Sequence, residues 1–327
     1  MKILFSADWH IKLNTKNIPN EWSINRYNLL FERTHALESK VCTHIIGGDL
    51  FDRLPTMEEL ELYFKFVEGC TIETIIYPGN HEALKRNTSF LSYLKTVTNR
   101  INPLVRIVDN YETLEFEDGS LVDILPYNKL KEYEKDRNQE WWPSDKRILC
   151  THVRGEIPPH VKPEVDLDIF NDWDVVLAGD LHSYENSQRN ILYPGSPVTT
   201  SFHRNTVGTG VIIFDTVSLE HEWIDLQLPQ LLRKTVKVGE ELVAGEYHHI
   251  IYEVEGDLSE LGAIEDNELL DKRVVKRDTD VALMLEPEMT LEEEVVEYMR
   301  YILQVPEATI DAALKEFHDN IKGLANV

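Results

Sequence analysis

The chain has 327 residues, of which 42% are hydrophobic and 28% charged, an ordinary composition for a well-packed protein with more than one domain. No run of about 18 apolar residues occurs, which excludes a membrane-spanning helix, and three isolated cysteines exclude a disulfide framework or a thiolate zinc site. Acidic residues outnumber basic ones by 58 to 33, a net charge of −25, and an even spread of this excess would repel nucleic acid. Because no signal-peptide pattern is present, we expect a cytoplasmic protein.

Short apolar runs alternate with amphipathic stretches over the first two thirds of the chain, a pattern typical of an α/β domain with helices flanking sheets. Strands are predicted at 3–5, 44–46, 74–77, 147–150, 175–178, 211–214 and 221–224, and helices at 26–37 and 57–66. Residues 113–125 predict a β-hairpin, because alternating apolar positions flank Asp118-Gly119, a dipeptide suited to a tight turn.

The pattern changes near Leu228-Pro229. Residues 236–256 and 273–285 predict a small sheet-containing module. After it, Thr290 and Glu293 form a capping-box pattern, and apolar spacing over 291–302 and 310–321 predicts a helix-loop-helix. We therefore expect three parts, at 1–230, 231–287 and 288–327.

Possible metal ligands follow five of the predicted strands directly. They are Asp8-Trp9-His10, Gly48-Asp49, Gly79-Asn80-His81, Thr151-His152 and Gly179-Asp180-Leu181-His182. Ligands of α/β proteins bind beyond the carboxyl ends of strands, so these side chains can converge. Carboxylate, imidazole and amide donors suit manganese, magnesium, iron or zinc, and a carboxylate such as Asp49 can bridge two ions. Each motif alone could be an ordinary turn, whereas the ordered set indicates a metal site.

This ordered set resembles the calcineurin-like metallophosphoesterase superfamily, whose pattern is Asp-x-His, Gly-Asp-x-x-Asp, Gly-Asn-His-Asp/Glu, Gly-His and Gly-His-x-His. Residues 5–10, residues 48–52 and Pro194-Gly195-Ser196-Pro197 are similar to the nuclease subunit of recombination nuclease complexes, the SbcD type, and most to the version encoded by tailed phages. The resemblance implies an α/β fold, a two-sheet β-sandwich flanked by helices, with a small α+β capping module and a C-terminal helix-loop-helix. It also implies a two-metal DNA nuclease, acting on ends and also internally.

The resemblance assigns a role to each motif residue. One metal would take Asp8, His10, Asp49 and His182, and the other Asp49, Asn80, His152 and Asp180. His81 would be the general acid that protonates the leaving oxygen. Position 180 is Asp where the family pattern has His, and this extra hard oxygen favours manganese, with magnesium as the alternative, over zinc.

The resemblance also implies partners. Basic residues near the site or in the second module would contact DNA: Arg154, Arg189, Arg204, Lys272 and Arg273. An ordinary solvated surface is the other interpretation of these residues. Residues 288–327 would grip the coiled coil of an ABC-type ATPase, in a heterotetramer containing a nuclease homodimer, or would simply dock on their own domain. No Walker A motif occurs, so any ATP dependence must come from a partner.

The acidic excess is compatible with DNA as a partner, because it is unevenly spread. Residues 278–319 hold 12 acidic and 2 basic side chains, two fifths of the imbalance. The complex would act in DNA recombination, repair and replication, in the cytoplasm of an infected host cell if the gene is phage-encoded. Two rival functions stay open: a phosphoprotein phosphatase or small-molecule phosphodiesterase of the same superfamily, and a non-catalytic DNA-binding scaffold subunit.

Overall fold

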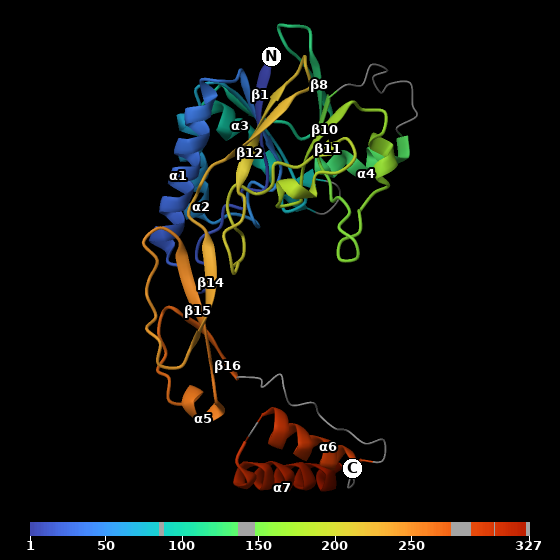
Figure 1. Ribbon diagram of the computed structural model, residues 1–327. Helices are drawn as coiled ribbons and strands as arrows, with labels where there is room; N and C mark the ends of the chain where they lie inside the picture. The colour runs from blue at the N-terminus through green and yellow to red at the C-terminus, as the bar shows by residue number, and fades with distance from the viewer. Residues whose placement is uncertain (85–87, 137–147, 276–288, 304, 325–327) are drawn as a thin grey trace. The chain divides into compact units, whose positions relative to one another are not determined.

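The computed structural model describes residues 1–84, 88–136, 148–275, 289–303 and 305–324 (Figure 1). The chain divides into two compact units. The first comprises Met1–Leu232 and Glu246–His249, and the second comprises Arg233–Gly245 and Ile250–Val327. In the described part of the chain, no helix is long and apolar enough to cross a membrane.

The first unit contains a six-stranded sheet in the order β13-β12-β1-β2-β3-β6. Its strands are β1 Lys2–Ser6, β2 Thr43–Gly47, β3 Glu73–Tyr77, β6 Val105–Ile107, β12 Gly210–Asp215 and β13 His221–Asp225. The four strands from β1 to β6 are parallel, whereas β12 and β13 are antiparallel additions at one side. The carboxyl ends of β1, β2 and β3 therefore lie at the same edge of this sheet.

A second sheet of the first unit has the order β11-β10-β9-β8-β7. Its strands are β7 Glu112–Glu115, β8 Leu121–Leu125, β9 Ile148–His152, β10 Val175–Gly179 and β11 Ile191–Leu192. The β7–β8 hairpin is confirmed, and Gly119 in its turn has a φ of +79°. Of the strand predicted at 147–150, residue 147 lies outside the described residues. Parallel pairing of β9 with β10 brings their carboxyl ends together.

The two sheets pack face to face. Phe5 and Ile45 of the first sheet share one buried cluster with Ile124, Cys150 and Leu177 of the second. Successive side chains of a strand point to opposite faces, so the neighbouring residues face the helices instead. Strands buried on both faces appear in sequence as the continuous apolar runs that predicted them. The two-sheet sandwich expected from the sequence is confirmed.

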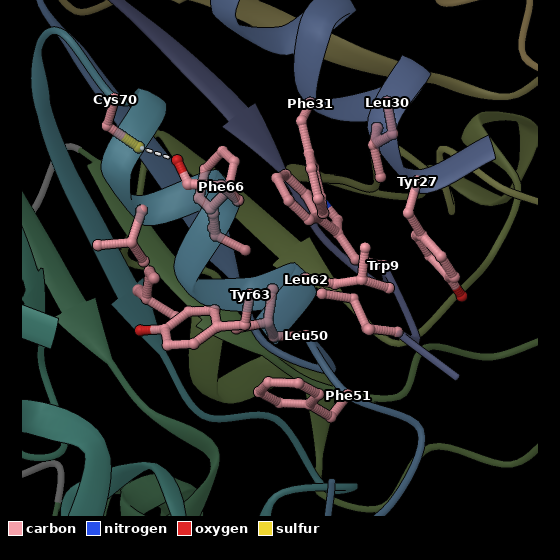
Figure 2. Packing of buried hydrophobic residues seen from close by; sticks show 14 of the residues in the cluster. Trp9, Tyr27, Leu30, Phe31, Leu50, Phe51, Leu62, Tyr63, Phe66 and Cys70 are labelled. Atoms are coloured by element: carbon pink, nitrogen blue, oxygen red, sulfur yellow. Dashed lines mark hydrogen bonds between the residues drawn. The ribbon is translucent and has the colours of Figure 1, made fainter. Parts of the chain in front are cut away.

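Helices cover the outer face of each sheet. Those on the first sheet are α1 Asn20–Glu38, α2 Met57–Gly69 and α3 Leu91–Ile101, and those on the second are α4 Tyr127–Asp136 and the 3₁₀ turn η1 Leu167–Phe170. Figure 2 shows the packing under α1 and α2, where the Trp9 ring lies 5.9 Å from Phe31 and 4.8 Å from Phe66. Sequence patterns did not predict α3 or α4. Short elements complete the unit: β4 Ala83–Leu84, β5 Thr88–Ser89 and η2 Tyr184–Asn186.

The second unit is a small sheet followed by helices. The sheet order is β14-β15-β16, with β14 Leu231–Lys237, β15 His249–Gly256 and β16 Leu270–Val275, and α5 Leu258–Leu261 follows β15. The C-terminal elements are α6 Leu291–Glu297, the π-helical turn η3 Tyr298–Ile302 and α7 Glu307–Leu324. The predicted capping box is present, since Thr290 and Glu293 bond each other's backbone N–H groups. Residues 276–285 of the predicted module lie outside the described residues.

Candidate metal centre

The predicted ligands follow the carboxyl ends of five strands. Asp8 and His10 follow β1, Asp49 follows β2, Asn80 and His81 follow β3, His152 ends β9, and Asp180 and His182 follow β10. These strands come from both sheets of the sandwich, so the residues meet along one end of it. Asp8, His10, Asp49 and His152 are buried. Sequence spacing alone brings no two of these motifs together, whereas the sandwich does.

Backbone conformation directs these side chains inward. Asp8, His10, Asp49 and Asp180 have φ values of 57°, 45°, 49° and 105°, although non-glycine residues rarely adopt positive φ. Such strain persists where the surrounding structure imposes it, commonly at functional sites. Gly79 allows the close approach of two of these loops, because a Cβ atom there would collide with the Asp49 carboxylate.

Three overlapping groups of donor atoms could hold a metal ion. Within each group the atoms lie within 4.8 Å of one another, and the groups are Asp8, His10, His182; Asp8, Asp49, His152; and His10, Asp49, His81. The Nε2 atoms of His10 and His182 are 3.1 Å apart, and His152 Nε2 lies 3.5 Å from Asp49 Oδ2. The resemblance gives Asp8 to the first metal only, but here its carboxylate belongs to two groups. Asn80, with its amide nitrogen facing Asp49, is 2.9 Å from both Asp49 Oδ2 and His152 Nε2.

The buried carboxylates of the centre carry negative charge that bound cations would neutralise. Burial opposes protonation of His152, yet the carboxylates of Asp49, Asp8 and Asp180 outweigh it and raise the pKa of His152 to about 9. Burial is also the main cause that raises the pKa of Asp8 well above its usual value, and the charge of Asp49 adds to it. Burial and the neighbouring His10 lower the pKa of His182 to about 4, so this imidazole is neutral, as ligation requires. Hard oxygen and imidazole donors with excess negative charge fit divalent metal ions.

Asp180 is paired with Arg154. Nε and Nη2 of Arg154 lie 3.2 and 3.4 Å from the two carboxylate oxygens of Asp180, while Asp180 Oδ1 is 3.9 Å from His152 Nε2. The backbone N–H of Asp180 donates to the Asp8 carboxylate at 3.1 Å. The negative charge that Asp adds where the family pattern has His is therefore balanced by a guanidinium, which the sequence had suggested as a DNA contact.

His81 stands at the edge of the centre. Its side chain is partly exposed, and its Nδ1 lies 2.6 Å from the backbone carbonyl oxygen of Asp52. Nδ1 therefore donates to that carbonyl, which leaves Nε2 on the side of the Asp49 carboxylate, 3.8 Å from Oδ2. The backbone N–H of His81 donates to Asp49 Oδ1 at 2.9 Å, so the loop carrying His81 is tied to a proposed ligand.

Glu82 belongs to the Gly-Asn-His-Glu motif, and its role becomes visible only in the folded chain. Its buried carboxylate accepts backbone N–H groups from Asp49 at 3.0 Å, Phe51 at 2.8 Å and Gly79 at 2.8 Å, which joins the loops that follow β2 and β3. Burial and the charge of Asp49 raise the pKa of Glu82 to about 7. The acidic fourth position of the Gly-Asn-His-Asp/Glu pattern was the signal that could have found this role.

Two further residues hold the loop after β1. Asp52 lies 3.6 Å from His10 Nδ1 and forms an ion pair with Lys12 at 2.7 Å, and these contacts hold its pKa well below the usual range. The hydroxyl of Ser196, in the Pro-Gly-Ser-Pro turn, donates to the carbonyl oxygen of Asp8 at 2.6 Å. That turn is therefore bonded to the loop that follows β1.

The remaining basic candidates have partners within the chain or lie on the surface. Arg189 pairs with Asp168 at 2.6 Å, Lys272 with Glu253 at 2.8 Å, and Arg273 with Asp266 at 2.8 Å. Arg204 is exposed. Such ion pairs are common among surface cations.

Comparison with known proteins identifies the class. Residues 1–184 match the family model described as "Calcineurin-like phosphoesterase". The chain belongs to this family, which confirms the resemblance found in the sequence, and it is a hydrolase of phosphoesters in a family that uses divalent metals.

Individual relatives narrow the comparison. Over 326 residues, 96% of this chain and 97% of the relative, the chain is 42% identical to "Probable exonuclease subunit 1" of Escherichia phage T5. It is 27% identical over 218 residues, 62% of this chain and 71% of the relative, to "Putative phosphoesterase 244L" of Invertebrate iridescent virus 6. Among solved structures, TT1561 of Thermus thermophilus aligns with a TM-score of 0.43 and 10% identity, over 69% of this chain and 99% of that one.

Proposed function

We propose that this chain is a two-metal DNA nuclease that degrades DNA from ends and also cuts internally. The observation that carries the proposal is the convergence of buried carboxylate and imidazole donors at the strand ends. DNA as the substrate is supported by the phage T5 relative, named an exonuclease subunit, which matches almost the whole chain. The same name supports a role as one subunit of a complex.

Seven side chains would hold the metals. Asp8, His10, Asp49 and His182 would hold one ion, and Asp49, Asn80, His152 and Asp180 would hold the other. Two bound divalent ions polarise the phosphoryl group and lower the pKa of an attacking water. Manganese, with magnesium as the alternative, suits a set rich in carboxylate oxygen. The Asp180 carboxylate has lone pairs enough to ligate while it stays paired with Arg154, so the guanidinium would keep a positive charge at the edge of the centre.

His81 would act as the general acid. Because its Nδ1 donates to the Asp52 carbonyl, the proton delivered to the leaving 3′ oxygen would be held on Nε2. Nε2 lies 3.8 Å from Oδ2 of Asp49, which is a proposed metal ligand.

The variant His81→Ala tests this assignment. Manganese-dependent cleavage of linear duplex DNA should fall by about 10² to 10³-fold, the usual contribution of a general acid. Manganese content per chain should not change. His221→Ala, which alters an exposed histidine of β13, is the matched control and should keep full activity. Full activity of His81→Ala would remove the assignment, and lost manganese would make His81 a ligand, as its donor group with His10 and Asp49 permits.

The partner would be a coiled-coil ABC-type ATPase that binds residues 288–327. Leu291, Tyr298 and Tyr301 are exposed large apolar side chains of this segment, flanked by acidic residues, and such a surface suits a protein partner. Deleting residues 290–327 should abolish co-purification with the ATPase and leave manganese binding intact. Loss of manganese as well would mean that the helices support the nuclease fold. The complex would serve DNA recombination, repair and replication, in the host cytoplasm if phage-encoded.

A nuclease homodimer within a heterotetramer is the proposed assembly. Helix α3 exposes Tyr93, Val97 and Ile101, and Leu104 follows it. Residues spaced by three or four share one helix face, so these form an apolar stripe that a second copy would cover. Val97→Glu should convert a dimer to a monomer in sedimentation experiments; an unchanged mass would exclude this face.

Two rival functions are separable by assay. Faster hydrolysis of p-nitrophenyl phosphate esters than of linear duplex DNA would favour a phosphatase or small-molecule phosphodiesterase. A manganese content below one ion per chain at saturation would favour a non-catalytic DNA-binding scaffold subunit.

A further inference from the structure

A pocket of the first unit adjoins the metal centre and has no part in the mechanism above. Its lining includes His10 and Asp52 of the ligand loops, and Ser23, Arg26 and Tyr27 of α1. The Tyr27 hydroxyl donates to the His10 carbonyl oxygen at 2.6 Å and accepts the Lys12 N–H at 3.1 Å. The wall formed by α1 is thereby fixed to the loop that carries His10.

Arg26 carries a buried positive charge that has no counterion among the described residues. Its side chain is 5% exposed, and its Nε has no hydrogen-bond partner in that part of the chain. Its Nη1 donates to the Thr199 carbonyl oxygen at 3.0 Å, and the guanidinium lies 4.9 Å from the Trp22 ring and 5.4 Å from the Tyr27 ring. Buried charges are ordinarily paired, because removing them from water is costly.

The side chains that line the pocket favour the binding of an oxyanion. Asp52 is the carboxylate of the pocket, and it is already paired with Lys12. The lining also contains Lys12, Ser23 and Thr200, whose ammonium and hydroxyl groups are hydrogen-bond donors beside the Arg26 guanidinium. Guanidinium and hydroxyl donors around one small space match the oxygens of a phosphate group.

We propose that the Arg26 pocket binds a phosphate group of the DNA strand, either the phosphate next to the scissile one or a terminal phosphate. This inference rests on the proposed nuclease function and names a phosphate subsite beside its metals. A phosphate held at a fixed place relative to His10 would set the register of the strand over the metal centre. It would also offer DNA a cationic contact in a chain whose net charge is −25.

The first test needs no nuclease activity. The full chain, freed of metal by a chelator so that phosphate cannot bind at metal ions, is unfolded thermally with and without inorganic phosphate. Ligand binding to the folded state raises the melting temperature. Wild type should gain stability from phosphate, whereas Arg26→Met should gain none and should melt higher than wild type without phosphate, because an unpaired buried charge has been removed. Arg33→Met is the matched control, since Arg33 lies on the same helix, bonds the Leu226 carbonyl and should respond like wild type.

A second variant covers a failure of Arg26→Met to fold. Arg26→Lys keeps the charge but loses the planar set of donors, so it should fold and show less than half of the wild-type gain with phosphate. Phosphate stabilisation of Arg26→Met or Arg26→Lys equal to that of wild type would overturn the proposal.

The second test uses DNA and manganese. Arg26→Met should raise KM about tenfold, the effect of losing one charge-assisted contact, with kcat within about twofold. If the pocket takes a terminal phosphate, wild type should prefer phosphorylated to hydroxyl-ended oligonucleotides, and Arg26→Met should lose this preference. If it takes an internal phosphate, KM should rise equally for both. An unchanged KM would overturn the proposal, whereas absence of any wild-type cleavage would refute the nuclease function and leave the phosphate test of the pocket to stand.

Discussion

His44 of β2 should make the fold sensitive to acid. Its ring is fully buried, its Nε2 lies 2.9 Å from the Ser6 hydroxyl, and its Nδ1 has no partner in the described part of the chain. Burial is the main cause that lowers its pKa from 6.5 to about 3. Because the folded-state value is depressed, the stability that neutral His44 gives is complete above pH 6.5 and is lost progressively as the pH falls toward 3.

The size of the effect follows from the shift. Each pKa unit corresponds to about 1.4 kcal/mol, so lowering the pH from 6.5 to 5 should cost about 2 kcal/mol through His44 alone. The variant His44→Leu has no group to titrate. At pH 7 it should be close to wild type in stability, because the lost bond to Ser6 is offset by the removal of an unpartnered buried nitrogen.

Urea denaturation at pH 7 and pH 5 measures the difference. Wild type should lose about 2 kcal/mol more than His44→Leu between the two conditions. The control His221→Leu changes an exposed histidine, and it should lose as much as wild type. An equal loss in wild type and His44→Leu would refute the reasoning, since the buried ring would then be protonated without cost.

Three further predictions concern the metal centre. Glu82→Ala removes the acceptor of three buried N–H groups, so it should lower the free energy of unfolding by about 3 kcal/mol and weaken manganese binding. The control is Glu59→Ala, which removes a buried carboxylate that accepts the N–H groups of Leu13 and Thr56. This control should lower stability without weakening manganese binding. Asp180→His should raise the zinc-to-manganese ratio that elemental analysis finds after loading with both metals, and an unchanged ratio would argue against ligation by this residue. Manganese binding at pH 7.5 should release about one proton from His152, whose pKa is about 9, because a ligating imidazole is neutral. Calorimetry in buffers of different ionisation enthalpy measures this proton release. No release would contradict the assignment of His152 as a metal ligand.

Sequence patterns predicted correctly the elements that depend on interactions between residues close in the chain. Strands such as β2 and β10 are short runs rich in β-branched residues that end in glycine, and this pattern predicts both the strand and the turn after it. The capping box at Thr290 depends only on residues three apart and was predicted correctly. Helix α3 was missed although its apolar residues have helical spacing, and α4 is strongly polar, so its helical state depends on packing of Leu130 and Tyr133 against the second sheet.

The sequence by itself determined the family, the sandwich and the order of the ligand motifs, because each motif is a contiguous strand end. Only the tertiary structure decided which side chains lie next to these motif residues. Arg154 and Asp180 are separated by 26 residues, and Arg26 lies 173 residues from the carbonyl that it bonds. A guanidinium can lie on the surface, pair with a carboxylate or be buried without a counterion, and burial and residues distant in the chain decide which. Neither can be read from residue type, since all arginines carry the same charge.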